Sequence, residues 1–359
     1  MQIESAWKSV LRPSGQWRSV IDFFCERCGR VFKAPDPAVC TEDGIELRPL
    51  AARLPERGEL IGKHYRVNKK VGDGGMCAIY SATDLTNDTE VAVKVLHPEL
   101  ATEPGQSESM LYEVSLSLSL DDENLVRCYD GGISRNGFHF MVMDLLEGRT
   151  LAQLLAIRGR VCMEDAAEIF IGAARGLHAV HQSGHVHRDV KPENIFINGN
   201  ATTRTIMAER VKLMDLGVAR PANAPVRSMT VYGTPEYMSP EQVSGQSLDR
   251  RSDLYSLGVV LYEMLTGKPC FDGTDAREVM LAHIRRQPPA LPESLEVTPL
   301  GRILSGIVTS LLQKKPDDRP SSALEISRLI PLADIRRNTT SRLDFSFFET
   351  SAPPEHRLP

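Results

Sequence analysis

The chain has 359 residues, of which 42% are hydrophobic and 25% charged, so it is expected to be a soluble globular protein with one large domain or two to three smaller ones. Its formal charge of -5 provides no basic field, which excludes nucleic acid as an expected partner. No apolar run approaches the length of a membrane span, and the first residues lack the apolar core of a signal peptide. Seven cysteines, an odd number, fit a reducing compartment better than a disulfide framework. These features predict a cytoplasmic protein without a membrane segment.

Residues 21–50 contain two short cysteine motifs. Cys25 and Cys28 form a C-x-x-C-G motif, and Cys40 and Asp43 form a C-x-x-D-G motif. The pair resembles a zinc-ribbon segment, in which tight turns aim ligands at one zinc ion. Because only three thiols are present, Asp43, a water or a distant histidine has to supply the fourth ligand. Three interpretations stay open: a structural zinc site, a ribbon-like fold without metal, and a chance pattern.

Three other segments carry no core pattern. Residues 1–20 form an N-terminal extension to which we assign no role, although it holds both tryptophans. Residues 51–64 are rich in charge, and two prolines lie in the stretch around them, so they are expected to be a linker. Residues 332–359 end in a proline-rich stretch and are expected to be a flexible tail.

From residue 65 to residue 96 the pattern indicates three short strands. Between the first two lie Gly72, Gly74 and Gly75, and glycines allow a backbone to approach a triphosphate closely. Such a loop is weak evidence by itself. The third strand places Ala92 and Lys94 on one face, so an alanine and an amine point the same way.

A lysine that faces inward from an apolar strand requires an anionic partner, because a bare buried charge is costly. Residues 109–120 have Leu111, Val114 and Leu118 at helical spacing, and this helix carries Glu113 as the candidate partner. Glu108 is the competing candidate.

Further along, residues 138–143 are expected to form a strand and residues 150–183 to form helices. The second helix is expected to bury a run of apolar residues, namely Ala167, Phe170, Ile171, Ala174, Leu177 and Val180. The neighbouring His178, His181 and His185 lack a matching carboxylate pattern and are interpreted as structural or solvated.

The segment from His185 to Phe196 crowds an acid, a base and an amide into six residues. Asp189 can orient a hydroxyl and accept its proton, and Lys191 can neutralise a phosphate in transfer. The amide oxygen of Asn194 can hold a metal ion. This is a loop suited to the chemistry of charged groups.

The same segment resembles the catalytic loop of Ser/Thr protein kinases, H-R-D-x-K-P-x-N. Three further motifs follow the family order. They are the glycine-rich loop with Cys77 at the third glycine, Asp215-Leu216-Gly217 for D-F-G, and the stretch from Gly233 to Glu241 for G-T-x-x-Y-x-x-P-E with Ser239 for alanine. The resemblance implies an α+β, bilobal protein kinase fold at residues 65–331, with lobes at 65–148 and 149–331, preceded by the small cysteine module.

By this resemblance, ATP is the nucleotide substrate and Mg²⁺ (or Mn²⁺) its metal ion. The implied ATP-binding residues are Val71, Gly72, Gly74, Gly75, Ile79, Ala92, Lys94, Met143, Asp144, Leu145, Asn194 and Asp215. Among them, Asn194 and Asp215 are the implied metal ligands, and Lys94 with Glu113 forms the implied ion pair on the phosphates.

The implied catalytic residues are Asp189, Lys191, Lys94 and Glu113, and the implied partners are protein substrates and a second copy of the chain for trans-autophosphorylation. Candidate phosphorylation sites are Thr230, Ser228 and Thr234, with Thr234 also expected to contact Asp189 and Lys191. Two structural roles are also implied: Asp253 anchors the catalytic loop, and Arg319 pairs with Glu241.

The predicted function is transfer of the γ-phosphoryl group of ATP to Ser or Thr hydroxyls of proteins, including the chain's own activation segment. The alternative is a nucleotide-binding pseudokinase that acts as a scaffold. The enzyme is favoured because the charged residues that transfer requires are all present in order.

Overall fold

A computed structural model describes most of the chain, which divides into two compact units. One unit comprises residues 1–118 and 128–145, the other residues 119–127 and 146–359. Within them, the described residues are 23–25, 27, 31–32, 39–51, 53–103, 105–199, 206–222 and 233–331. The predicted ligand Cys28, the phosphorylation candidates Ser228 and Thr230, the N-terminal extension and the tail from residue 332 lie outside these residues.

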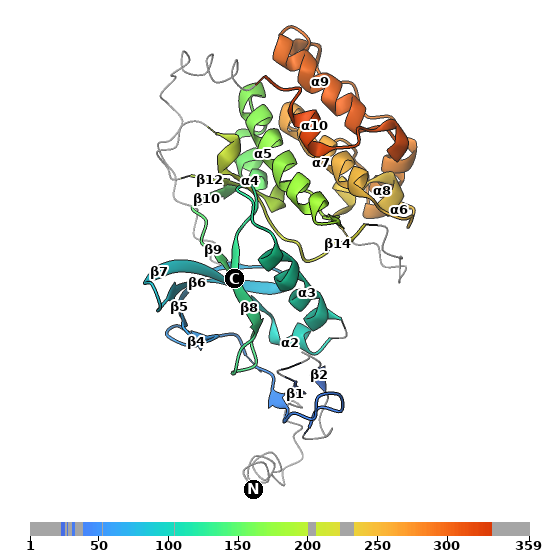
Figure 1. The fold of residues 1–359 in the computed structure, drawn as a ribbon. Coiled ribbons are helices and arrows are strands. Elements are labelled where there is room, and N and C mark those ends of the chain that lie inside the picture. The colour runs from blue at the N-terminus through green and yellow to red at the C-terminus, as the bar shows by residue number, and fades with distance from the viewer. Residues whose placement is uncertain are drawn as a thin grey trace. The chain divides into compact units, whose positions relative to one another are not determined.

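The smaller unit is built on a six-stranded antiparallel sheet in the order β4-β5-β6-β7-β9-β8 (Figure 1). Asp88 adopts a positive φ of 59° in the turn before β7, as suits a tight Asn-Asp turn. The three strands expected from residue 65 and the later strand near residue 140 are therefore present. Their bounds are β4 Leu60–Ile61, β5 Tyr65–Asp73, β6 Cys77–Asp84, β7 Thr89–Leu96, β8 Cys128–Ile133 and β9 His139–Asp144.

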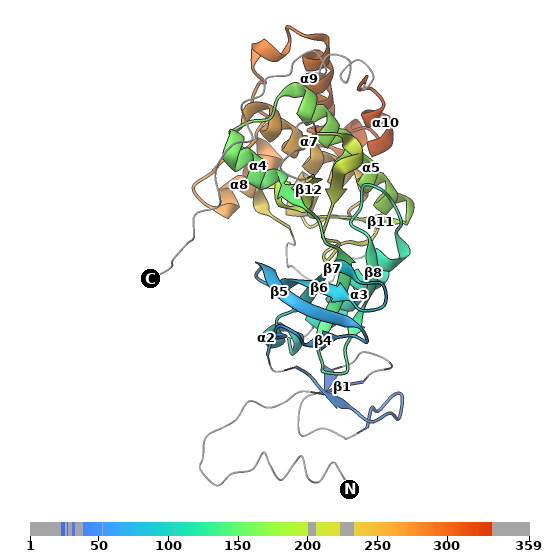
Figure 2. The same cartoon turned by 90° about the vertical axis from the view of Figure 1, so that its left-hand side faces the viewer.

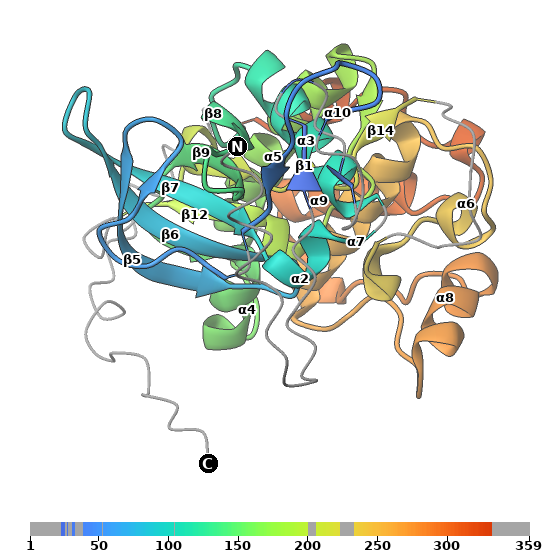
Figure 3. The same ribbon diagram turned by 90° about the horizontal axis from the view of Figure 1, so that it is seen from below.

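Two helices, α2 (Pro98–Ala101) and α3 (Gln106–Ser119), lie on one side of this sheet, where β1 is also found (Figures 1 and 3). The helix expected at 109–120 exists, but its buried stripe differs from the expected one. Leu118 is exposed, whereas Met110, Glu113 and Val114 are buried. Residues three and four apart share a helix face, so Met110, Glu113 and Val114 lie together on the buried face. This face includes the Glu113 carboxylate and leaves Leu118 out. An apolar count alone could not have placed a buried glutamate there.

The cysteine module forms its own three-stranded sheet in the order β2-β1-β3. Its strands are β1 (Phe23–Phe24), β2 (Val31–Phe32) and β3 (Arg48–Pro49), all antiparallel. The short length of these strands means that hydrogen bonds between them contribute little alone, so the module depends on side-chain packing.

Residues 51–64, expected to be a linker, are partly packed against the sheet in the structure. Leu60–Ile61 pair with β5 as an edge strand, and the Ile61 side chain is fully buried. Ala51 and Leu54 pack against the same hydrophobic cluster. These apolar residues are too few and too far apart to produce a recognisable period, so only the packed sheet reveals that the segment belongs to it.

His139, in β9, is a buried histidine whose ring has no hydrogen-bond partner within the described part of the chain. Its side chain is 1% exposed, and burial lowers the pKa of His139 to about 4. The unfolded chain should titrate near its ordinary value of about 6.5. The unfolded state therefore binds more protons between these two pH values, and stability falls as the pH drops through that window.

We expect the free energy of unfolding to fall by about 2–3 kcal/mol between pH 7 and pH 4.5 through this residue. His139→Leu should lose less stability over the same range, because the substituted side chain does not titrate. Urea unfolding followed by circular dichroism at several pH values measures this difference. An unchanged slope for His139→Leu would contradict the assignment.

The larger unit is mainly helical, and α5 is in contact with α7, α9 and α10 (Figure 2). Its helices are α4 Leu151–Arg158, α5 Met163–Gln182, α6 Pro240–Val243, α7 Arg250–Thr266, α8 Ala276–Arg285, α9 Pro299–Leu311 and α10 Ala323–Ser327. Among the described residues of this unit there are also five 3₁₀ turns: η1 Pro192–Asn194, η2 Ala208–Arg210, η3 Pro235–Tyr237, η4 Glu293–Leu295 and η5 Pro316–Asp318.

The part of this unit that the structure describes also has two small sheets. One has the order β10-β12-β13, and the other pairs β11 with β14. Their bounds are β10 Gly148–Thr150, β11 His185–Val186, β12 Ile195–Asn198, β13 Val211–Leu213 and β14 Arg220–Pro221. The candidate catalytic loop therefore runs from β11 to β12, held at both ends by strand pairing.

Local sequence explains where the main helices begin and end. Thr150 and Gln153 form a capping box at the start of α4, and the Asp249 side chain caps α7. Gly267 ends α7 with a left-handed φ of 71°.

The six apolar residues expected to be buried in α5 are all at most 2% exposed. No helix of the described ranges is both long and apolar enough to span a membrane.

The division into units differs from the expected boundary after residue 148. It lies after Leu145, and residues 119–127 belong to the larger unit although they precede β8. The reason is a parallel bridge between Leu125 and Leu213, with a 3.2 Å hydrogen bond from the Val126 N–H to the Leu213 carbonyl. A long-range pairing of this kind leaves no local pattern in the sequence.

Candidate functional site

Lys94 and Glu113 form a closely paired salt bridge within the smaller unit. The Lys94 Nζ lies 2.8 Å and 3.0 Å from the two carboxylate oxygens of Glu113. The side chains are 16% and 5% exposed, so both charges are largely removed from water. Glu108, the competing candidate, is exposed in the first turn of α3. The expected pairing of the strand lysine with Glu113 is therefore present.

The glycine-rich loop joins β5 to β6 and is held by contacts at its tip. The Gly74 N–H donates to the Cys77 carbonyl at 2.9 Å, which closes the turn. The ring of His97 lies 3.0 Å from the Gly74 carbonyl and 3.2 Å from an Asp73 carboxylate oxygen. A Cβ placed on Gly75 would meet no atom within 4 Å, so the backbone there is open to a ligand.

The remaining expected nucleotide-binding residues of this unit lie on neighbouring strands. Ala92 is buried in β7 and pairs in register with Met143 of β9. Asp144 ends β9, and its carboxylate accepts a hydrogen bond from the Tyr129 hydroxyl at 2.5 Å. Val71 and Ile79 flank the glycine-rich loop, and Leu145 follows Asp144. The sheet therefore brings these positions together from β5, β6, β7 and β9.

In the larger unit, Asp189 is the centre of a polar cluster. One carboxylate oxygen lies 2.7 Å from the Lys191 Nζ and accepts a 3.1 Å hydrogen bond from the Asn194 amide. The other oxygen accepts from the backbone N–H of Thr234 at 3.2 Å and from its hydroxyl at 3.3 Å. The Lys191 ammonium also donates to the Thr234 hydroxyl at 2.8 Å. The carboxylate is thus oriented on both sides.

Asp253 anchors this loop, as expected. Its two oxygens accept 2.8 Å hydrogen bonds from the N–H groups of His187 and Arg188, and one oxygen lies 2.7 Å from the His181 ring. Burial opposes ionisation of Asp253, but the hydrogen bond and charge of His181 and the Arg188 N–H outweigh it, so its pKa is lowered. The His187 ring is buried and bonds the Met214 carbonyl at 3.1 Å.

Backbone strain concentrates at this site. Within the described ranges, three residues other than glycine have positive φ, and two of them are Arg188 (71°) and Asp215 (63°). Such conformations cost of order 1–3 kcal/mol and persist where surrounding contacts enforce them. Beside Asp215, the Met214 N–H donates to the Asn194 carbonyl at 2.9 Å, and the Leu216 side chain is buried.

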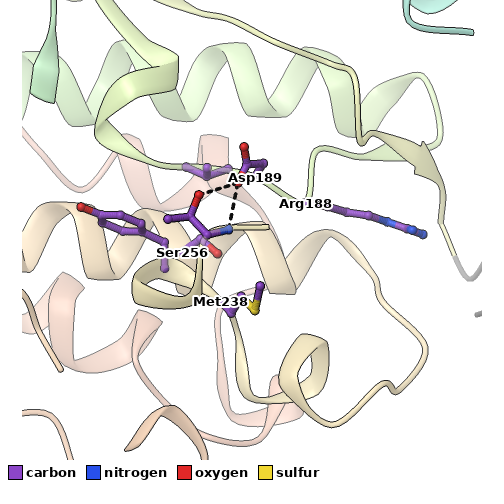
Figure 4. A pocket seen from close by; sticks show the side chains of 7 residues that line it. Arg188, Asp189, Met238 and Ser256 are labelled. Atoms are coloured by element: carbon purple, nitrogen blue, oxygen red, sulfur yellow. Dashed lines mark hydrogen bonds between the residues drawn. The ribbon is translucent and has the colours of Figure 1, made fainter. Parts of the chain in front are cut away.

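A small pocket lies between the catalytic loop and the following segment (Figure 4). Its lining includes Arg188, Asp189, Thr234, Met238 and Ser256, and Figure 4 shows the Arg188 side chain extending away from Asp189. The two dashed bonds of Figure 4 join Thr234 to Asp189. The Thr234 hydroxyl lies between the Asp189 carboxylate and the Lys191 ammonium, which are the two contacts expected of it.

Sequence inspection missed several supporting contacts. Ser239, which replaces the alanine of the motif, caps α6 in a capping box with Gln242, and the Gln242 amide donates to the Arg188 carbonyl at 2.8 Å. The S-x-x-Q spacing is a recognisable capping signal and could have been found. The His97 contacts to the glycine-rich loop carry no such signal, because a single histidine before a proline has no distinctive pattern.

The cysteine module also holds a cluster of ligand atoms. One carboxylate oxygen of Asp43 lies 3.3 Å from the Cys25 Sγ and 3.8 Å from the Cys40 Sγ. The three ligand atoms lie within 4.8 Å of one another. Three of the four expected ligands are thus brought together, and Cys28 lies outside the described residues.

Comparison with known proteins agrees with this geometry. The family model described as the protein kinase domain matches residues 65–328. The chain is 38% identical over 267 residues to the serine/threonine-protein kinase PknA of Corynebacterium glutamicum, covering 73% of this chain and 54% of that protein. It is 37% identical over 274 residues to PknB of Mycolicibacterium smegmatis, covering 74% of this chain and 42% of that protein.

PknB of Mycobacterium tuberculosis is 35% identical over 273 residues, which is 74% of this chain and 42% of that protein. The chain thus spans about half the length of the relatives it matches. The matched region contains the glycine-rich loop, the Lys94–Glu113 pair and the Asp189 cluster. From this match and the order of its motifs, the chain belongs to the protein kinase family.

Proposed function

We propose that the protein is a serine/threonine protein kinase, which transfers the γ-phosphoryl group of ATP to a Ser or Thr hydroxyl of a protein. The single observation that carries this proposal is the cluster at Asp189, where a carboxylate is oriented by Thr234 on one side and by Lys191 and Asn194 on the other. Lysine two residues after the aspartate is typical of Ser/Thr specificity by family resemblance. The relatives named as serine/threonine-protein kinases support the same specificity.

In this mechanism, Asp189 accepts the proton of the attacking hydroxyl, and Lys191 neutralises charge on the phosphoryl group. Asp189 accepts a hydrogen bond from the Thr234 hydroxyl, so it can accept one from a substrate hydroxyl of the same kind. In-line transfer requires little covalent chemistry from the protein, so orientation and charge neutralisation should provide most of the rate. Lys94, held by Glu113, binds the α- and β-phosphates, and the glycine-rich loop covers them.

The oxygen ligands suit a hard metal ion such as Mg²⁺ (or Mn²⁺). The Asn194 amide nitrogen donates to Asp189, so the amide oxygen is the atom that would bind the metal ion, and Asp215 would contribute a carboxylate. Both are oxygen donors of the type that Mg²⁺ prefers. When bound, the ion neutralises negative charge on the phosphates. We propose that the residues that bind the nucleotide are the twelve implied by the sequence resemblance, of which Val71 is the first and Asp215 the last.

The alternative is a pseudokinase that binds nucleotide and acts as a scaffold. Mass spectrometry of the purified protein incubated with ATP and Mg²⁺ separates the two. An active kinase should accumulate phosphoserine or phosphothreonine on itself or on an added protein substrate. Absence of any modified residue, with nucleotide bound, would favour the scaffold.

Thr230 and Ser228, outside the described residues, are proposed as autophosphorylation sites, by a second copy of the chain acting in trans. Phosphate there would provide an anion for Arg188, which precedes the catalytic aspartate. We expect Thr230→Ala to lower activity at least several-fold, and to remove the corresponding phosphopeptide. A Ser247→Ala variant, away from the segment, serves as the control. Unchanged activity of Thr230→Ala would count against this regulation.

We also propose that residues 21–50 form a zinc-ribbon-like module that binds one structural Zn²⁺. Ligands of a tetrahedral zinc ion lie roughly 3.5–4 Å apart, given Zn–S bonds of about 2.3 Å. The 3.8 Å distance from Asp43 to the Cys40 sulfur falls in this range, and the 3.3 Å distance to the Cys25 sulfur lies just below it. Cys28 is the proposed fourth ligand. The metal would cross-link a module whose strands are only two residues long.

The zinc proposal has a direct test. The purified protein should contain about one zinc ion per chain, measured by inductively coupled plasma mass spectrometry. Cys40→Ser should lose most of this metal, because a serine hydroxyl is a poor zinc ligand at neutral pH. Cys162→Ser, in the larger unit, should retain it. Equal zinc content in both variants would rule the cluster out.

For the whole chain we propose an N-terminal extension (1–20), the cysteine module (21–50), a kinase domain (65–331) and a C-terminal tail (332–359). The segment 51–64 is better assigned to the packed part of the smaller unit than to a linker, because β4 joins the sheet.

A further inference from the structure

The two faces of strand β1 pack against different parts of the smaller unit. Cys25 forms a buried cluster with Cys40 and Leu47. Phe23, two residues before Cys25, packs against this cluster. Phe24, between them, joins a different cluster. Successive side chains of a strand point to opposite faces, so one face of β1 carries the proposed metal cluster and the other faces the kinase sheet.

The second cluster links β1 to the helix that carries Glu113. Phe24 is 0% exposed, and it shares this cluster with Met110 and Val114 of α3. Leu96 at the end of β7 and Met141 of β9 complete the contact with the sheet. Val114 is the neighbour of Glu113, and Met110 lies one turn earlier. The residues that seat α3 therefore flank the glutamate that binds Lys94.

The backbone also fixes the other end of the module. Leu50, immediately after β3, is 6% exposed and belongs to the same cluster as Phe24. The next residue, Ala51, donates its N–H to the Gly137 carbonyl in the β8–β9 turn at 3.2 Å. The module is thus attached to the sheet at two points, the Phe24 and Leu50 contacts of the α3 cluster and the hydrogen bond from Ala51 to Gly137.

We propose that Phe24 is a positioning residue for the Lys94–Glu113 ion pair: the cysteine–aspartate cluster holds β1, and Phe24 on β1 holds α3 at the depth that brings Glu113 to Lys94. This inference rests on the proposed role of Glu113 in nucleotide binding. It couples the metal cluster to the nucleotide site through one aromatic side chain. Loss of the metal, or of Phe24, should loosen α3.

The measurement is hydrogen–deuterium exchange of α3 in the full chain, with and without zinc. Phe24→Ala should raise the exchange of residues 106–119 by about tenfold, because a large cavity opens beneath the helix. Phe24→Leu should restore most of the protection. Leu118→Ala, on the exposed face of the same helix, should leave it near the wild-type level. Zinc removal should raise exchange in the wild type and add little in Phe24→Ala.

A second readout follows nucleotide binding without phosphoryl transfer. The Kd of a fluorescent ATP analogue should rise several-fold in Phe24→Ala, and the KM for ATP should rise more than kcat falls. If no transfer occurs in any variant, the proposed kinase activity fails, while exchange and analogue binding still decide this inference. Two results overturn it: α3 exchange unchanged in Phe24→Ala, or exchange raised equally in α3 and in all sheet strands, which would mark Phe24 as a general core residue.

Discussion

Replacement of Asp189 by asparagine is expected to lower kcat about 10²–10⁴-fold, the usual contribution of a positioned general base. Asparagine has nearly the same shape and keeps an oxygen that accepts from the Thr234 N–H, so the fold should survive. It cannot accept the substrate proton, and its amide group would face the ammonium of Lys191. Both effects act on transfer, whereas the affinity for ATP should change by less than about threefold.

Steady-state phosphorylation of a protein substrate, with binding of an ATP analogue measured in parallel, checks this result. Asp272→Asn is a matched control, because the Asp272 side chain is 91% exposed and lies in the same unit. The control should retain wild-type kinetics. Asp189→Asn with a rate within a few-fold of the wild type would remove the basis of the proposed mechanism.

Replacement of Arg319 by alanine is expected to destabilise the larger unit by about 3–5 kcal/mol. The guanidinium lies 2.6 Å and 2.9 Å from the two carboxylate oxygens of Glu241, and the Arg319 side chain is 0% exposed. It also donates to the carbonyls of Gln313, Arg251 and Lys314. Alanine would leave a buried carboxylate and several carbonyls without these donors, which is the costly way to break a buried pair.

Urea unfolding followed by circular dichroism measures the loss. Arg286→Ala is the matched control, because that side chain is 51% exposed and its ion pairs with Glu278 and Asp272 are on the surface. Such pairs contribute about 0–1 kcal/mol. A loss for Arg319→Ala no greater than for Arg286→Ala would contradict the structural role assigned to the buried pair.

Some packing could be predicted because it leaves a periodic or local pattern. The six buried residues of α5 recur at helical spacing along twenty residues, and the structure buries all of them. The strands from residue 65 are eight or nine residues long. Elements of this length leave a pattern that can be recognised from the sequence alone. The five-residue α10 has too few turns to leave such a pattern.

The candidate site was predictable at the level of residue identity. The functional residues of a motif lie close together in the sequence: Asp189, Lys191 and Asn194 fall within six residues. The structure adds their relation to distant residues: Thr234 is 45 positions from Asp189, and Asp253 is 65 positions from Arg188. The resemblance implied both contacts, but composition and periodicity could not have shown them.

The amino-acid sequence by itself determined the kinase motifs, their order and the strongly periodic helices and strands, because these signals are local to a few turns or residues. Only the tertiary structure decided that Glu113 is buried on α3, that β4 belongs to the sheet, and that Phe24 and Leu50 join the cluster under α3. Each of these depends on which side chains meet across long stretches of chain. Burial of isolated apolar residues is a property of packed surfaces, and no short pattern in the sequence encodes it.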